Sequence, residues 1–151
     1  MKNVIITGTS SGLGFELVKK FNAENYNIIS LSRSPCLIKS NLVEHFNFDI
    51  TDSKSISELQ KLIQSKYKTI DILINNAGML INKPFVELSK EEFISVYEVN
   101  FFGVIELIRE ILPFFKSKSQ IINVSSIGGI SGTSKFKGLS AYSSSNGALN
   151  I

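Results

Sequence analysis

Apolar runs of strand length alternate with amphipathic, helix-like segments along the whole chain. Continuous apolar strands that alternate with helices are typical of a parallel sheet buried on both faces. Right-handed crossovers then give a doubly wound α/β fold, here in one domain over 1–151. We expect strands at 3–7, 27–31, 43–48, 71–75 and 120–124, and helices at 13–21, 52–68, 89–112 and from 139, still running at 151.

Composition narrows the kinds of site that the chain can hold. Cys36 and His45 are the only cysteine and histidine, so neither an internal disulfide nor a metal site is predicted. The net charge of +3 is spread along the chain and predicts no nucleic-acid partner. No apolar run in the sequence reaches the roughly 18 residues of a membrane span. The strand pattern starts at Asn3 without signal-peptide features, so we expect a cytoplasmic protein.

A glycine-rich turn, Thr7-Gly-Thr-Ser-Ser-Gly-Leu-Gly14, joins the first strand to the first helix. Glycines there let the backbone approach a pyrophosphate closely, and the next helix points its N–H groups and positive dipole end at the phosphates. The alternative is a glycine-rich surface turn, but this position favours a Rossmann-like dinucleotide site. The predicted cofactor contacts in the turn are Gly8, Ser10, Ser11, Gly12, Leu13 and Gly14.

Further motifs follow in a fixed order along the chain. They are Asp49-Ile50, Asn75-Asn76-Ala77-Gly78, Asn100, Asn123-Val-Ser125-Ser126 and Ala141-Tyr142-Ser-Ser-Ser. With the Gly-x3-Gly-x-Gly turn, the series resembles the single-domain branch of the short-chain dehydrogenase/reductase family over the whole chain. The resemblance implies that Asp49 and Ile50 contact adenine, and that Asn76, Ala77 and Gly78 lie along the cofactor. It also implies a fold of about seven strands, of which about five are present, so the chain is interpreted as truncated at its C-terminus.

The end of the second strand sets the choice between the two nicotinamide cofactors. An acidic residue there binds the ribose 2′-hydroxyl of NAD, whereas a nearby arginine accepts the 2′-phosphate of NADP. The segment Ser30-Leu-Ser-Arg33-Ser34 offers no carboxylate, and the planar guanidinium of Arg33 suits a phosphate. NADP is therefore predicted as the preferred cofactor. NAD is the alternative, with Arg33 then an ordinary solvent-facing residue.

The resemblance also implies hydride transfer between the nicotinamide and the carbonyl or alcohol carbon of a small molecule. Tyr142 would exchange the hydroxyl proton, Ser126 would hold the substrate oxygen, and Asn100 would join a proton relay through water. The family's lysine, one helical turn after the tyrosine, is replaced by Asn146. A unit positive charge about 4 Å away is worth ~4 kcal/mol to tyrosinate at an effective dielectric near 20. The neutral amide of Asn146 cannot supply that stabilisation.

Three interpretations of the chain stay open. The first is an NADP-dependent reductase or dehydrogenase that is weakly active or present here only in part. A loop lysine, Lys135 or Lys137, is a candidate to replace the missing charge, but two solvated loop lysines are the favoured interpretation. The second is a dinucleotide-binding pseudoenzyme, or the inactive partner of an active relative. The third is a truncated product with no stable fold. Family members often assemble through the long helix and the tyrosine helix, so a homo-oligomer is a candidate state. The sequence identifies no substrate beyond a carbonyl or alcohol.

Overall fold

The computed structural model describes all residues from Met1 to Ile151 and contains one parallel sheet of five strands, in the order β3-β2-β1-β4-β5. The predicted doubly wound, Rossmann-like fold is confirmed. The strands are β1 (Asn3–Thr7), β2 (Asn27–Ser32), β3 (Val43–Asn47), β4 (Ile70–Asn75) and β5 (Phe115–Asn123). The α-helices are α1 (Gly12–Ala23), α2 (Ser53–Leu62), α3 (Lys90–Tyr97), α4 (Gly103–Ile111) and α5 (Ser140–Leu149).

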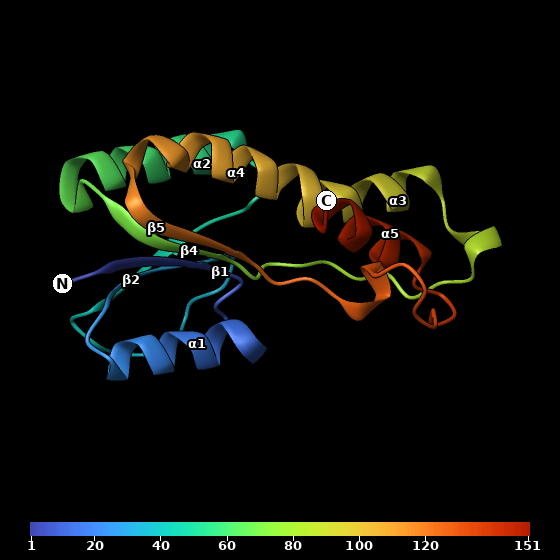
Figure 1. The fold of residues 1–151 in the computed structure, drawn as a ribbon, viewed down its shortest axis with the longest axis horizontal. Coiled ribbons are helices and arrows are strands. Elements are labelled where there is room, and N and C mark those ends of the chain that lie inside the picture. The colour runs from blue at the N-terminus through green and yellow to red at the C-terminus, as the bar shows by residue number, and fades with distance from the viewer.

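Helices cover the two faces of the sheet unequally (Figure 1). Helices α2 and α4 lie on one face, and α1 lies on the other. Alternate side chains of β1 pack on opposite faces of the sheet. Ile5 packs in the larger apolar cluster with α2 and α4. Val4 and Ile6 pack in the smaller cluster with Val18 of α1. All four side chains are fully buried. The central strands therefore form the core, as their continuous apolar runs predict.

The long helix expected at 89–112 begins as predicted but is not continuous. Its Ser89–Glu92 capping box is present, with hydrogen bonds of 3.1 and 2.8 Å between each side chain and the other residue's backbone N–H. A π-helical turn, Glu98–Phe102, then separates α3 from α4. Helix α2 likewise passes into a π-helical turn at Ile63–Tyr67. The buried positions Val96, Asn100 and Val104 stay four residues apart across the turn at Glu98–Phe102, so the spacing gives no sign of it.

Strand β5 is an edge strand and is longer than predicted. Its pairing with β4 shifts register, since Ile70 pairs with Phe115 but Ile72 pairs with Gln120. Most of β5 is exposed, including 38% of Ile121 and 44% of Ile122. Strand β5 is therefore an uncovered edge of the sheet in this structure.

Helix α5 begins close to the expected position but ends at Leu149, so the prediction that it still runs at Ile151 was wrong. The backbone N–H of Ile151 bonds to the carbonyl of Ala148, three residues back, so the regular four-residue ladder has ended at this point. Helix α5 packs against α3 and the π-helical turn, as Figure 1 shows. No helix of the structure combines the length and the apolar character needed to cross a membrane.

Candidate cofactor and active site

The turn after β1 can take its shape only with glycine at particular positions. Gly8 has φ +71, and a Cβ there would lie 2.9 Å from the Cα of Ala77. A Cβ at Gly14 would collide with the carbonyl oxygen of Gly8 and lie 2.6 Å from Nδ2 of Asn76. Gly12 has φ +57 but open space around it. The first and third glycines therefore allow close packing, whereas the second supplies only a left-handed backbone.

Backbone and side-chain hydrogen bonds fasten this turn to the end of β4. The backbone N–H groups of Asn76 and Ala77 both donate to Oγ1 of Thr7, across 2.9 and 2.8 Å. Nδ2 of Asn76 donates to the carbonyl oxygens of Thr7 and Gly8, across 3.0 and 3.2 Å. The strand order reverses between β1 and β4, and such a switch point is where open parallel sheets bind ligands.

A groove of about 510 Å³ lies at this switch point, along the carboxyl ends of β1, β2 and β4. Three predicted cofactor residues do not line it: Gly12, Leu13 and Gly14 belong to the start of α1. The predicted residues that do line it are Gly8, Ser10, Ser11, Arg33, Asp49, Ile50, Asn76, Ala77 and Gly78.

The cationic and anionic groups of the groove differ in their partners. Arg33 is exposed and forms no ion pair in the structure. The carboxylate of Asp49 accepts hydrogen bonds from the backbone N–H and the hydroxyl of Thr51, across 2.9 and 2.8 Å. Both bonds reach Oδ1 of Asp49, and neither Arg33 nor Asp49 forms an ion pair, so the groove carries one unpaired group of each charge.

Asn100 lies in the π-helical turn, is buried, and is bound at both ends of its side chain. Its Oδ1 accepts from the backbone N–H of Met79 across 2.7 Å, and its Nδ2 donates to the carbonyl of Met79 across 2.9 Å. Nδ2 also donates to Oγ of Ser145 across 3.0 Å. Asn100 therefore ties the segment after β4 to α5, across a break in the helix of a kind that often occurs at functional sites.

Ser126 and Tyr142 keep their hydroxyl groups free of protein acceptors. Oγ of Ser126 accepts from the backbone N–H of Gly128 across 3.1 Å, which leaves its hydroxyl hydrogen available. Both side chains are half-buried. Neither of them, nor Asn100, lines the groove of the predicted cofactor residues. The structure thus gathers the cofactor residues but does not place the catalytic candidates in that groove.

Asn146 lies one turn after Tyr142 and is buried. Its Nδ2 donates to the carbonyl oxygen of Tyr142 across 2.9 Å, and its Oδ1 accepts from the hydroxyl of Ser125 across 3.3 Å. The amide is therefore used between α5 and the segment after β5. It brings no charge to the hydroxyl of Tyr142.

The ammonium group of Lys135 is bound within its own loop. It donates to the carbonyl oxygens of Gly128 and Ile130, across 2.8 and 2.6 Å, and to the hydroxyl of Thr133 across 2.9 Å. These bonds occupy its three hydrogens. Lys137 is exposed.

Sequence reasoning missed several residues that shape the groove. Thr7 holds β4, and Met79 and Val99 complete the lining. Thr9 and Ser32 are buried hydroxyl residues joined by a hydrogen bond. Polar residues inside an apolar strand or a glycine turn are the signal that could have revealed Thr7, Thr9 and Ser32.

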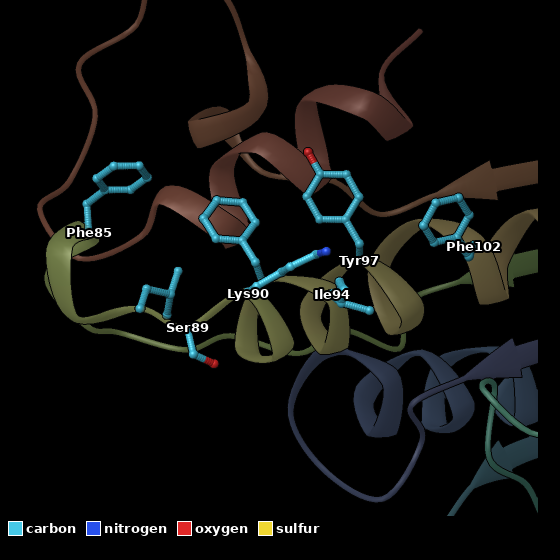
Figure 2. A pocket seen from close by; sticks show the side chains of 8 residues that line it. Phe85, Ser89, Lys90, Ile94, Tyr97 and Phe102 are labelled. Atoms are coloured by element: carbon cyan, nitrogen blue, oxygen red, sulfur yellow. The ribbon is translucent and has the colours of Figure 1, made fainter.

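A second, apolar groove of about 640 Å³ lies away from this site, along α3. Figure 2 shows the rings of Tyr97 and Phe102 pointing to the same side of the helical segment, Phe85 on the turn that precedes α3, and Ile94 on α3 itself. Phe85 is 70% exposed and Phe102 is 51% exposed. Large exposed aromatic side chains in a row are typical of a surface that contacts another protein or an apolar ligand.

Comparison with known proteins finds similarity along the whole length. The model of the family described as short chain dehydrogenase matches residues 2–151. The chain is 35% identical to the uncharacterized oxidoreductase YusZ of Bacillus subtilis, covering 98% of this chain and 56% of that protein. It is 36% identical to the 3-ketodihydrosphingosine reductase of Bacteroides thetaiotaomicron, covering 85% and 48%.

Solved structures give the same result. A short-chain dehydrogenase from Leptospira borgpetersenii with bound NAD+ superposes with a TM-score of 0.89 and 31% identity, covering 98% of this chain and 61% of that one. A short-chain dehydrogenase from Streptomyces avermitilis gives a TM-score of 0.88 and 29% identity, covering 98% and 56%. The chain spans about half the length of the curated relatives that it matches.

Proposed function

Because the chain belongs to the short-chain dehydrogenase/reductase family, we propose that residues 1–151 act as its dinucleotide-binding domain and bind NADP(H). The reaction proposed for the protein is hydride transfer between that cofactor and the carbonyl or alcohol carbon of a small molecule. The observation that carries the proposal is the groove at the β1/β4 switch point, which gathers nine of the predicted cofactor residues.

The residues of the turn suit a dinucleotide. Gly8 and Gly14 leave the space that a Cβ would fill, so a phosphate group can approach the backbone. Helix α1 begins after Ser11 without a side-chain cap and has no acidic residue in its first turn. Its first N–H groups are therefore available to an anion, and the helix dipole favours negative charge there.

Arg33 supports NADP over NAD. Its guanidinium is exposed in the groove without an ion-pair partner, and residues 30–34 at the end of β2 contain no carboxylate that could bind a ribose hydroxyl. A charged fork of this kind binds a phosphate through two parallel hydrogen bonds. NAD is the competing cofactor, since a similar solved structure holds NAD+.

Titration calorimetry of Arg33→Ala tests this assignment. We expect NADPH binding to weaken by about 1.5–3 kcal/mol, the range for a hydrogen bond to a charged group, with NADH binding nearly unchanged. Lys39→Ala is the matched control, because Lys39 is an exposed cation of the same connecting segment outside the groove. Equal losses of affinity for NADPH and NADH would contradict the assignment of Arg33 to the 2′-phosphate.

The proposed catalytic roles follow from the hydroxyl groups that are free. Ser126 would donate to the substrate oxygen, and Tyr142 would exchange the proton of the carbonyl or alcohol group. Asn100 would join a proton relay through water, and its bonds to Met79 would hold the π-helical turn in place. The bound nicotinamide would supply or accept the hydride. Asn146 favours a second candidate function, a dinucleotide-binding protein with little or no catalytic activity, because its amide cannot stabilise tyrosinate.

We further propose that copies of the chain assemble through the long helix. The exposed side chains of Phe85, Ile94 and Phe102 form an apolar surface on α3 and the adjoining turns. Closed dimers use one surface twice, and a helix face with aromatic anchors suits such a contact. The other occupant of this groove would be an apolar ligand, which would leave the chain monomeric.

A further inference from the structure

Three buried hydroxyl groups connect the phosphate-binding turn to the end of β2. Thr9 and Ser30 are fully buried, and Ser32 is 7% exposed. Oγ1 of Thr9 lies 2.7 Å from Oγ of Ser30 and 3.0 Å from Oγ of Ser32. Ser32 also donates to the carbonyl oxygen of Ser34 across 2.7 Å. Thr9 belongs to the turn, whereas the serines belong to β2 and the residues that follow it.

The direction of this hydroxyl chain follows from counting hydrogens. Each hydroxyl has one hydrogen to donate and can accept from two sides. The hydrogen of Ser32 goes to the carbonyl of Ser34, so Thr9 must donate to Ser32, and Ser30 must then donate to Thr9. Each hydroxyl hydrogen therefore makes one bond: Ser30 donates to Thr9, Thr9 donates to Ser32, and Ser32 donates to the carbonyl of Ser34. In a buried chain of this kind each bond strengthens the next.

The hydrogen bond from Ser32 to Ser34 joins the residues on either side of Arg33. Ser32 and Ser34 flank Arg33 on either side, and all three residues line the groove together with Ser10 and Ser11 of the turn. The backbone on both sides of Arg33 is thereby tied to Thr9, while the guanidinium itself stays exposed. An exposed arginine gains affinity when its backbone is held in the binding geometry beforehand, because less conformational freedom is lost on binding.

We propose that the hydrogen-bonded path Thr9–Ser32–Ser34 positions Arg33 opposite the phosphate-binding turn and thereby sets the discrimination between a ribose 2′-phosphate and a 2′-hydroxyl. Ser32 is the specificity-determining member, because it alone contacts both Thr9 and the carbonyl beyond Arg33. The inference rests on the proposed function, in which Arg33 receives the 2′-phosphate. If the hydroxyls serve only to fill the core beneath the turn, their loss affects both cofactors alike.

Two serine substitutions of equal size separate these roles. Ser32→Ala removes the bond to Ser34, and Thr9 can then donate to Ser30 instead. Ser30→Ala is the matched control, because it removes another buried hydroxyl that contacts Thr9 but leaves the path from Thr9 through Ser32 to Ser34 intact. Both variants are compared by titration calorimetry with NADPH and NADH, and with 2′,5′-ADP and 5′-AMP as small probes.

We expect Ser32→Ala to lower the ratio of NADPH to NADH affinity by roughly three- to tenfold, the equivalent of one ordinary hydrogen bond. The ratio for 2′,5′-ADP over 5′-AMP should fall by a similar factor. The affinity of Ser32→Ala for NADH should stay within about twofold of the original, a smaller change than one ordinary hydrogen bond gives. The ratio of NADPH to NADH affinity in Ser30→Ala should also stay within about twofold of the original. Ser32→Thr, which keeps the hydroxyl, should restore the ratio. If Ser32→Ala does not fold, Ser32→Cys takes its place, since a thiol of similar size is a much weaker donor.

Parallel losses for NADPH and NADH in Ser32→Ala, or the same ratio in the two alanine variants, would overturn the positioning role. Arg33→Ala is measured alongside to keep the two proposals apart. An unchanged ratio in Arg33→Ala contradicts the 2′-phosphate assignment itself. If the ratio of NADPH to NADH affinity falls in Arg33→Ala but not in Ser32→Ala, Arg33 still binds the 2′-phosphate. Only the positioning role of the hydroxyl groups is then contradicted.

Discussion

The side-chain amide of Asn146 donates to the carbonyl oxygen of Tyr142 across 2.9 Å, so the residue at the expected lysine position is turned back onto its own helix. Ser145 donates to the same carbonyl across 2.9 Å and accepts from Asn100. Oδ1 of Asn146 is bound by Ser125. The amide is therefore a structural part of the joint between α5 and the end of β5.

The first prediction concerns Asn146→Lys, assayed in a protein that joins residues 1–151 to the C-terminal half of a longer relative. We expect the substitution to raise turnover by at least about tenfold, because roughly 4 kcal/mol of tyrosinate stabilisation is at stake at Tyr142. The gain should be larger toward neutral pH in the alcohol-oxidising direction, where tyrosinate acts as the base. Steady-state rates against pH are the measurement, and Asn146→Gln is the neutral control.

Equal activity of the joined protein with and without Asn146→Lys would show that the charge is unnecessary or is supplied elsewhere. Lys135→Met and Lys137→Met would then identify the source. We expect Lys135→Met to leave turnover unchanged. The three hydrogens of the Lys135 ammonium are bound by its own loop, so they are not available to the hydroxyl of Tyr142.

The second prediction concerns Gly14→Ala in the phosphate-binding turn. The new Cβ would collide with the carbonyl of Gly8 and press on Asn76, so we expect a loss of about 1–3 kcal/mol in the free energy of unfolding, typical of overpacking. The rise in Tm on adding NADPH should shrink with it. Gly78→Ala is the control for the free energy of unfolding without cofactor, since its Cβ would meet only Oδ1 of Asn100, at an ordinary 3.7 Å. A Gly14→Ala protein with unchanged Tm and NADPH response would refute the close approach.

The third prediction is the pH dependence contributed by Glu92. Its hydrogen bond from the backbone of Ser89, followed by that from Lys83, lowers the pKa of Glu92 below the ordinary 4.5. A depressed pKa in the folded state gives stability that is present above pH 4.5 and is lost as the pH falls through the folded value. Glu92→Gln should therefore lower Tm at neutral pH.

The difference in Tm between the original chain and Glu92→Gln should narrow as the pH falls below 4.5, and it should close only below the lowered folded-state pKa of Glu92, where both side chains are neutral. Glu91→Gln is the control, because Glu91 stands in the same helical turn but takes no part in the capping box. A constant difference across the acidic and neutral range would mean that charge is not the source of the effect.

The sequence predicted the sheet well because its central strands are buried on both faces, and continuous apolar runs such as Val4–Ile6 have few other uses. The capping box at Ser89 was equally visible, since it depends on two residues at a fixed spacing. The sequence did not show two other features, the π-helical turn at Glu98–Phe102 and the register shift between Ile70 and Ile72. Both insert residues at places where tertiary packing decides the geometry, and neither leaves a periodic signal.

Most of the groove could be predicted because parallel strands bring their carboxyl ends to one edge of the sheet. The motif residues Gly8 and Asn76 therefore had to lie near each other. The hydrogen bonds among Thr9, Ser30 and Ser32 could not be predicted, because the turn and β2 are separated in sequence and their contact depends on side-chain rotamers. The rotamer of Asn146, which turns its amide onto Tyr142, was hidden for the same reason.

The last prediction separates two kinds of self-association. The apolar face of the long helix should form a closed dimer, whereas the exposed edge of β5 should give open-ended association, because an unpaired strand edge can add further strands. Ile94→Glu, on the long helix, should convert the dimer to a monomer in sedimentation velocity. Ile122→Lys, on β5, should reduce light scattering at high concentration and leave the dimer intact, since a charged edge strand resists further pairing. Circular dichroism checks that both variants fold. A dimer that survives Ile94→Glu but not Ile122→Lys would place the interface on β5, and a monomer at all concentrations would leave the α3 groove to an apolar ligand.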